Sequence, residues 1–273
     1  MSVQTLLALI IPVPINQLTQ RRLDESQSAR NLLTKVPVRA LRNEQYVEPG
    51  DFFANYAGAL LNRQIDVFDD AMLLVGNDRV GSACVVSRGM IEAYALAQFA
   101  VEEVTRAFEN APSGSKVEKA LDITLKFTNS SRFKKSEQEK LKNGVFKLED
   151  YKFTEEAKER MLAELGNNVH VLNALRYLYA REKEETQLNE SKHELVYDAL
   201  SEWVHPSQTS VWLTYATSAQ AIETSLGTIT LRDAAMNYCS LALHFITASN
   251  QIFQHMLEVA NVINAASRSE ELR

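Results

Sequence analysis

Residues 80–108 read VGSACVVSRGMIEAYALAQFAVEEVTRAF, and this stretch decides the fold. Its apolar side chains lie on nearly every side of the helix that their spacing predicts: Val85, Val86, Met90, Ile91, Ala93, Ala95, Leu96, Phe99, Ala100, Val101 and Val104. A helix that is apolar all round must be covered by other elements. The pattern therefore predicts a long, central, buried helix.

Helical spacing of apolar residues continues on both sides of this stretch. Before it, residues 52–75 predict an amphipathic helix that Asp51 caps, and residues 76–78 predict a break. After it, we expect a helix over about residues 169–181 and another from Ser191, which forms a capping box with Glu194, to Pro206.

A last long helix is expected from Leu231 to about Ala265, capped by Thr230 with Asp233. Glycine and proline number only 9 and 6 among 273 residues, so turns are few. No linker rich in proline, glycine and serine separates two cores. We therefore predict an all-α fold, with an N-terminal arm over residues 1–50 and one helical bundle domain over residues 51–273.

The apolar stretch at residues 3–15 needs a separate interpretation. It lacks the positive charge and the cleavage site of a secretory signal, and it is too short to span a bilayer. We expect an apolar arm that packs on the body of the protein, and an interfacial membrane anchor is the alternative.

The net charge of −6 argues against a dedicated binder of duplex DNA or of a membrane surface. Cys84 and Cys239 lack metal-ligand spacing and lie among apolar neighbours, which indicates inert packing in a reducing, cytoplasmic setting. His244 and His255 would lie about 16 Å apart along one helix, too far to share a metal ion. The motifs of zinc peptidases, serine hydrolases and dinucleotide-binding proteins are missing from the sequence, so no metal or cofactor is predicted.

Residues 111–152 form a polar insertion that is predicted to be helical. Between residues 116 and 152 there are ten basic and six acidic side chains, and Ser136 with Glu139 predicts the start of a short helix. A solvated helical insertion is the favoured interpretation, and a surface that faces phosphates is the alternative.

Arg88 and Glu92 are the first candidate site residues. They are four positions apart on the most apolar helix, so they lie on one face and can pair. A buried charged pair is costly unless hydrogen bonds satisfy each member. The pair is therefore either a structural link between helices or part of a functional site.

His205 is the second candidate. Pro206 ends its helix, so the imidazole is expected at a helix carboxyl end, on the same face as Asp198 and Ser201. That position favours protonation and suits proton transfer near neutral pH. A histidine that only caps the helix is the alternative interpretation.

The motif Arg88-Gly-Met-Ile-Glu92, followed by Tyr197-Asp-Ala-Leu-Ser201-Glu-Trp-Val-His205-Pro206-Ser207, resembles an uncharacterised family of bacterial all-helical proteins that is distantly similar to HEPN domains. The resemblance covers roughly residues 52–262. HEPN ribonucleases place an arginine and a histidine on one helix, to bind phosphate and to assist the attack of the 2′-hydroxyl. Here the positions five to seven before His205 hold no arginine, so Arg88 would have to supply the cation.

The resemblance implies a cytoplasmic, HEPN-like protein of a bacterial defence or stress system, and two functional classes stay open. The favoured one is a binding or interaction module, with a homodimer or another protein as partner. The alternative is a metal-independent ribonuclease that uses Arg88, Glu92 and His205, with RNA as its partner. In either case Tyr197, Ser201 and Ser207 are the candidate ligand-binding residues.

Overall fold

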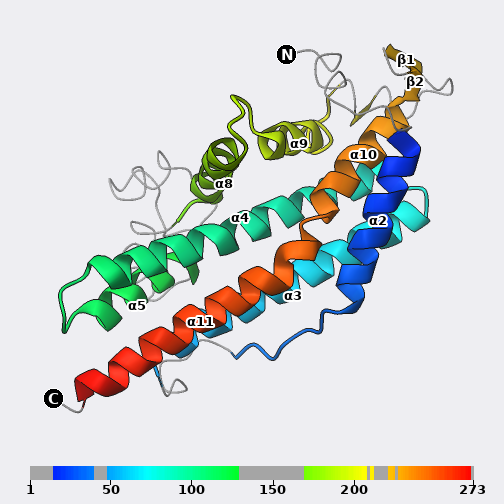
Figure 1. The fold of residues 1–273 in the computed structure, drawn as a ribbon. Helices are drawn as coiled ribbons and strands as arrows, with labels where there is room; N and C mark the ends of the chain where they lie inside the picture. The colour runs from blue at the N-terminus through cyan, green and yellow to red at the C-terminus, as the bar shows by residue number, and fades with distance from the viewer. Residues whose placement is uncertain are drawn as a thin grey trace, which may run out of the picture. The chain divides into compact units, whose positions relative to one another are not determined.

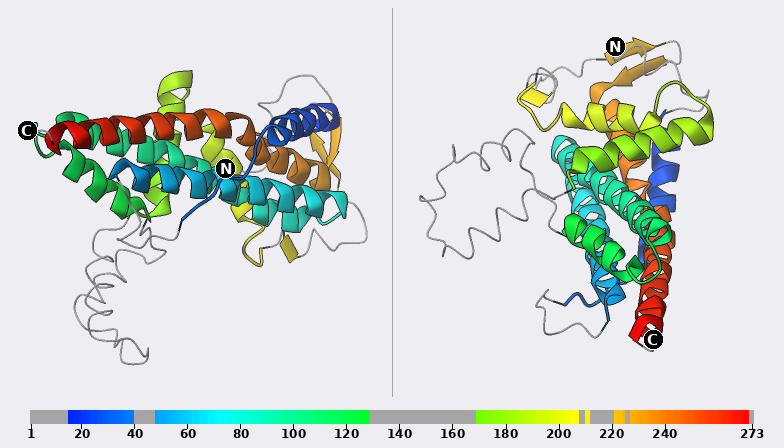
Figure 2. Two further views of the ribbon diagram at one scale, coloured as in Figure 1. Left: turned by 90° about the horizontal axis from the view of Figure 1, so that it is seen from below. Right: turned by 90° about the vertical axis from the view of Figure 1, so that its left-hand side faces the viewer.

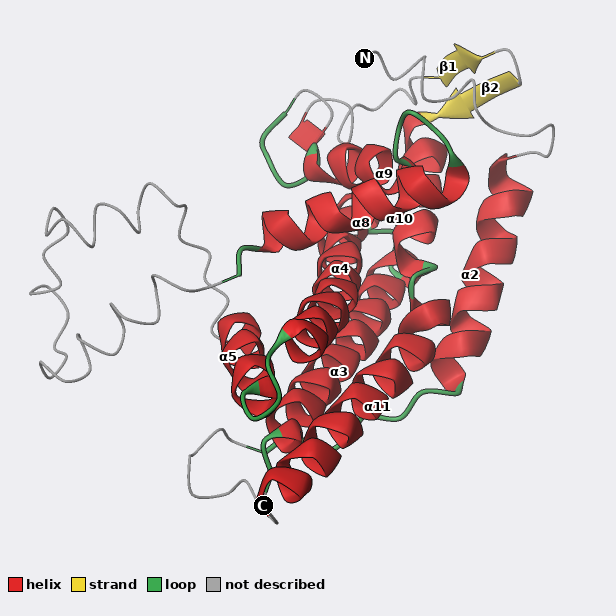
Figure 3. Cartoon of the chain, turned by 60° about the vertical axis from the view of Figure 1, so that its left-hand side comes forward, coloured by secondary structure: helices red, strands yellow, loops and turns green. Residues whose placement is uncertain are grey.

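A computed structural model of the chain describes residues 15–39, 48–128, 169–207, 210–211, 221–224 and 227–271. The all-α prediction is confirmed. In this part of the chain only one short antiparallel hairpin interrupts the helices (Figure 3). In chain order the helices are α2 (Ile15–Asn31), α3 (Gly50–Gly76), α4 (Val80–Asn110), α5 (Lys116–Thr128), α8 (Val171–Thr186), α9 (Lys192–Ser201), α10 (Leu231–Leu243) and α11 (Ile246–Glu271).

The contacts divide the chain into two compact units. Unit 1 comprises Met1–Pro37, Gly58–Tyr94 and Leu178–Phe253, and unit 2 comprises Val38–Ala57, Ala95–Tyr177 and Gln254–Arg273. Four helices, α3, α4, α8 and α11, contribute residues to both units. The predicted residues of interest, Arg88, Glu92, Tyr197, Ser201, His205 and Ser207, all belong to unit 1.

In unit 1, helix α10 packs against α2 and α9, and strand β2 (Gly227–Thr230) leads into it (Figure 1). Strand β1 (Ala221–Thr224) pairs with β2 so that Ile222 lies opposite Ile229. The predicted cap of α10 is confirmed as a full capping box, because the Thr230 side chain accepts from the Asp233 backbone N–H and Asp233 accepts from the Thr230 N–H. This box fixes where the strand ends and the helix begins.

The core of unit 2 is aromatic. Phe127 of α5 is fully buried, and its ring lies 5.5 Å from that of Phe99 and 6.3 Å from that of Tyr56. Phe99 also contacts Tyr177 of α8, at 5.2 Å between ring centroids. The beginning of the polar insertion is therefore a core helix and not a solvated one.

Several predicted boundaries are confirmed and others are wrong. Helix α3 ends at Gly76, Asp78 adopts a positive φ of 62°, and α4 begins two residues later, as the break at residues 76–78 predicts. Asp51 is not a cap, because α3 already begins at Gly50. Instead, the Asp51 carboxylate accepts a hydrogen bond from Asn264 of α11 at 3.0 Å.

The predicted last helix is in fact two helices. Helix α10 ends at Leu243 and α11 begins at Ile246. Between them the hydrogen bonds shorten to three-residue turns, from Phe245 N–H to the Ala242 carbonyl and from Thr247 N–H to the His244 carbonyl. His244 is therefore the C-cap of α10, whereas His255 lies within α11.

Parts of some predictions fall outside the described residues. These are the apolar stretch at residues 3–14 and the insertion from residue 129 onward, including the helix expected at Ser136. Within the described helices Val85 is exposed, although it was expected on the buried central helix. Helix α2 was not predicted at all, because its sequence is mostly polar.

Gly50 provides a test of how closely α3 and α11 approach in unit 2. A β-carbon at this position would overlap with the carbonyl oxygen of Ala260, and the Gly50 N–H donates to the Asn264 side chain at 2.6 Å. Gly50→Ala should therefore lower the free energy of unfolding by about 1–3 kcal/mol in urea titrations, because the backbones must move apart. Gly76→Ala, where a β-carbon meets no atom within 4 Å, is the control. Equal stability of the two variants would contradict the close approach.

Candidate functional site

The predicted pair on α4 forms. The guanidinium of Arg88 lies 3.1 Å from the Glu92 carboxylate, and their side chains are 24% and 31% exposed. The pair is therefore half-buried, so water can supply some of the hydrogen bonds of the two side chains. Its exposed part also means that solvent screens the attraction.

Tyr197 of α9 joins the pair and connects α4 to α9. Its hydroxyl donates to Glu92 Oε1 at 2.9 Å and accepts a hydrogen bond from the Arg88 Nη2. The Arg88 guanidinium also lies over the Tyr197 ring, 4.5 Å from its centroid, which adds a cation–π contact. We call these three residues the Arg88 clamp, because each member contacts the other two.

The proton of Tyr197 stays on its hydroxyl. Burial, and then the Glu92 carboxylate, raise the pKa of Tyr197 to about 12. A neutral hydroxyl can donate to the carboxylate and accept from the guanidinium at the same time. The clamp is therefore charge-balanced, with one cation and one anion.

Two polar atoms near the clamp have no hydrogen-bond partner among the described residues: Arg88 Nε and the Tyr179 hydroxyl, both buried. Burial raises the pKa of Tyr179 far above its ordinary value, with Tyr197 as a smaller contribution. Arg88 Nε and the Tyr179 hydroxyl are thus the groups in this region that can still donate a hydrogen bond.

Acidic side chains line one side of α9 near the clamp. Glu194, Asp198 and Glu202 recur at intervals of four residues, so they lie along one side of this helix. Partial desolvation, and then Glu194 and Glu202, raise the pKa of Asp198. Lys183 lies 3.4 Å from Glu194. A negative surface of this kind repels phosphate groups and attracts cationic ones.

The structure separates His205 from the clamp. Helix α9 ends at Ser201, and residues 202–206 form turns, so the expectation that His205 closes the helix is wrong. The His205 side chain is exposed, and its carbonyl accepts from Ser207 N–H at 2.7 Å. In the described part of the chain His205 has no side-chain bond to Arg88 or Glu92.

The two candidate serines have local roles. Ser201 Oγ donates to the Tyr197 carbonyl one turn earlier, at 2.7 Å, so it belongs to α9 itself. Ser207 Oγ donates to the Glu202 carbonyl at 2.9 Å and accepts from Ser210 N–H at 3.1 Å, which holds the turn after α9. The structure therefore joins Arg88, Glu92 and Tyr197, and leaves Ser207 and His205 in a separate turn.

Glu182 of α8 organises the start of α9 and was missed from sequence. Its Oε2 accepts from Ser191 Oγ at 2.5 Å and from His193 N–H at 3.0 Å, while Ser191 accepts from Glu194 N–H at 3.0 Å. The cap at Ser191 is thus confirmed, but the reciprocal half of the predicted capping box, from Ser191 N–H to the Glu194 carboxylate, is not among the described hydrogen bonds. The extra carboxylate comes from nine residues upstream of Ser191, too far for a capping motif to reveal.

His193 lies beside this carboxylate and against an aromatic ring. Its Nδ1 is 3.3 Å from Glu182 Oε2, and its ring centroid is 4.8 Å from that of Phe245. Burial lowers the pKa of His193, although Glu182 and Glu185 oppose the shift. This histidine is consequently a partly buried group whose protonation is disfavoured by its surroundings.

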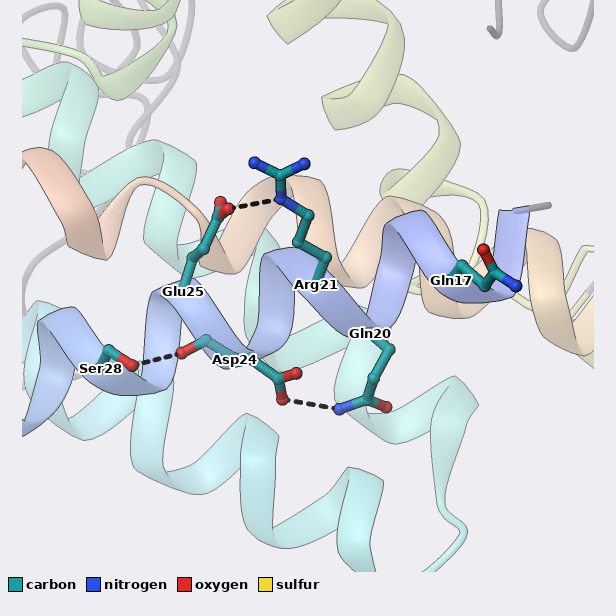
Figure 4. Close-up of a pocket in the computed structure, with 6 residues that line it drawn as sticks. All are labelled: Gln17, Gln20, Arg21, Asp24, Glu25 and Ser28. Atoms are coloured by element: carbon teal, nitrogen blue, oxygen red, sulfur yellow. Dashed lines mark hydrogen bonds and ion pairs between the residues drawn. The ribbon is translucent and has the colours of Figure 1, made fainter. Parts of the chain in front are cut away.

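Helix α2 docks on α10 through polar groups, which sequence analysis also missed. Arg22 donates to the side-chain oxygen of the buried Asn237 at 2.7 Å, and Ser26 Oγ lies 3.3 Å from His244 Nδ1. On its outer side α2 lines a surface pocket (Figure 4), with residues Gln17, Gln20, Arg21, Asp24, Glu25 and Ser28. These polar groups bond along the helix, as in Arg21 Nε to Glu25 at 2.8 Å. The pocket therefore offers no convergent set of catalytic groups.

Neither metal nor thiol chemistry is indicated. No group of histidine, cysteine, aspartate and glutamate in the described ranges could hold a metal ion. Cys84 and Cys239 are buried, and burial raises the pKa of both thiols, that of Cys239 to about 11. Such thiols are poor nucleophiles.

Comparison of the chain with known protein families, curated proteins and solved structures finds no match. The resemblance to HEPN domains therefore stays a prediction. Among the helices that the structure describes, none is long and apolar enough to cross a membrane.

The clamp predicts a stability effect at Tyr197. Tyr197→Phe removes the hydroxyl that both Arg88 and Glu92 use, so it should lower the free energy of unfolding by about 1–3 kcal/mol in urea titrations. Ser201→Ala is the matched control on the same helix, because its hydroxyl bonds only to a carbonyl of α9. A Tyr197→Phe variant as stable as the parent would show that the clamp carries no net stabilisation.

His193 predicts a pH dependence. Its pKa in the folded chain lies below the value of about 6.5 that it has when unfolded, so the unfolded chain binds more protons at mildly acidic pH. The free energy of unfolding should fall as the pH drops from about 7 to 5, and His193→Gln should make this fall shallower. Ser201→Ala changes no titratable group, so it should leave the slope unchanged. Identical slopes in the parent and in His193→Gln would contradict the assignment.

Proposed function

We propose that this chain is a HEPN-like helical binding module of the cytoplasm, and that the Arg88 clamp serves to position α9 for a partner protein. The observation that carries this proposal is the engagement of Arg88. Its guanidinium bonds to the Tyr197 hydroxyl and pairs with Glu92, whereas the His205 side chain lies exposed outside these contacts. A phosphate would have to compete with both partners for this guanidinium.

The charge around α9 supports a protein partner over RNA. Glu194, Asp198 and Glu202 make this surface acidic, and RNA phosphates would be repelled. Basic side chains of a protein would be attracted, and they would steer association. We propose a second copy of the chain as that partner, since HEPN-like proteins commonly pair through helices.

The test is the concentration at which the purified chain self-associates. We expect sedimentation equilibrium to show a dimer at tens of micromolar, and Asp198→Lys to weaken the dimer about tenfold, because one complementary charge contact becomes repulsive. Glu184→Lys makes the same charge change at an exposed site on α8 and should leave the dimer intact. A chain that stays monomeric throughout, or equal effects of the two variants, would refute pairing through α9.

The metal-independent ribonuclease is the rival function, and it requires Arg88 and His205 to act on one substrate. Under the binding-module proposal the purified chain should cleave no RNA in the presence of EDTA. Loss of a general acid or base usually costs about 10²–10⁴ in rate, so His205→Ala gives an unambiguous comparison. RNA cleavage by the parent that His205→Ala abolishes would overturn our proposal in favour of the ribonuclease.

A further inference from the structure

In unit 1, one face of α3 binds the end of α2 and the chain that follows it. Asn62, Asp66 and Asp69 recur at intervals of four and three residues, so they share a face of the helix. We call these three residues the α3 strip. The segment that contacts it, residues 30–36, comprises the last two residues of α2 and the five that follow. We call it the basic segment, after Arg30 and Lys35. Figure 2 shows the chain leaving α2 as a blue coil.

The α3 strip recognises the backbone of the basic segment at one point. Val36 N–H donates to Asn62 Oδ1 at 2.9 Å, and Asn62 Nδ2 donates to the Val36 carbonyl at 2.8 Å. A side-chain amide that satisfies both the N–H and the C=O of one residue does what a neighbouring strand would do. This contact is independent of the side chain that the bound residue carries.

The two carboxylates of the strip add a preference for charge. Arg30 donates from Nε to Asp69 Oδ1 at 2.8 Å and from Nη2 to Asp69 Oδ2 at 2.7 Å, which is a bidentate fork. Lys35 pairs with Asp66. Both basic residues precede Val36, and Arg30 belongs to the last turn of α2. The strip thus fits a basic peptide whose charged residues lie on the N-terminal side of its bound backbone.

The basic segment is held loosely. Lys35 and Asp66 are 52% and 47% exposed, and ion pairs of this kind contribute little to stability. Leu33 is buried, but the adjacent Leu32 is 86% exposed. Segments with few buried apolar contacts open locally more readily than the core does.

We propose that the α3 strip is a docking surface for basic peptides, and that the chain's own basic segment occupies it and competes with them. The occupant in the structure is the evidence for the kind of ligand, because it shows both the backbone contact and the paired charges. This surface is separate from the Arg88 clamp, so the proposal does not rest on the function proposed above.

The test is binding in trans of a fluorescently labelled peptide with the sequence of residues 29–37, ARNLLTKVP, measured by anisotropy. The full chain with Arg30→Ala and Lys35→Ala has a weakened occupant, so it should bind the peptide about tenfold more tightly than the parent does. A peptide with glutamate in place of both basic residues should not bind. No saturable binding to the double variant would overturn the proposal.

Variants of the strip show whether the peptide binds there. In the double variant, adding Asn62→Ala removes two hydrogen bonds and should weaken binding about tenfold or more. Asp69→Asn is a second variant of the strip. It tests the same site independently, so the result does not depend on whether Asn62→Ala folds. Asp70→Asn is the matched control, since it removes an exposed charge next to the strip. Binding that responds equally to Asp69→Asn and Asp70→Asn would refute the site.

Discussion

The structure depends on one constraint, which is that α4 has to be covered along its whole length. Its fully buried residues include Cys84, Met90 and Ile91 in unit 1, and Ala100 and Val104 in unit 2. Removing this apolar surface from water is the main favourable term available to the fold. Each unit therefore needs its own covering helices around the part of α4 that it contains.

This constraint explains why Arg88 and Glu92 need Tyr197. Charged groups on the most apolar helix lose part of their hydration when α9 is placed beside them. A tyrosine can compensate both charges with a single hydroxyl, and its ring covers the guanidinium as well. The pair thus becomes compatible with the packing of α9, and α9 gains a fixed position on α4.

Much of the fold was predictable because it rests on local signals. The apolar periodicity of α3 and α4, the break at residues 76–78, and the caps at Ser191 and Thr230 are all encoded within a few residues. The break between α10 and α11 was not predictable, because the apolar spacing continues through His244. Helix α2 was not predicted for the opposite reason. Side-chain hydrogen bonds hold it near α10, and its sequence has no apolar stripe that would indicate a helix.

The candidate site was predictable only in part. The spacing of Arg88 and Glu92 placed them on one face, but nothing in the sequence says that Tyr197, more than a hundred residues later, meets them. The contact of Glu182 of α8 with Ser191, at the start of α9, is a similar case. Such contacts depend on which helix faces lie together, and this is a property of the packed chain.

A motif that resembles a catalytic one can therefore arise from packing alone. From the sequence alone, Arg88 and His205 suggest a catalytic pair. In the structure, however, Arg88 has a carboxylate and a hydroxyl as partners. A cation whose charge is already balanced attracts an incoming anion weakly. The acidic side of α9 weakens that attraction further. Two of the residues that make the motif conspicuous, Arg88 and Tyr197, thus hold α9 against α4.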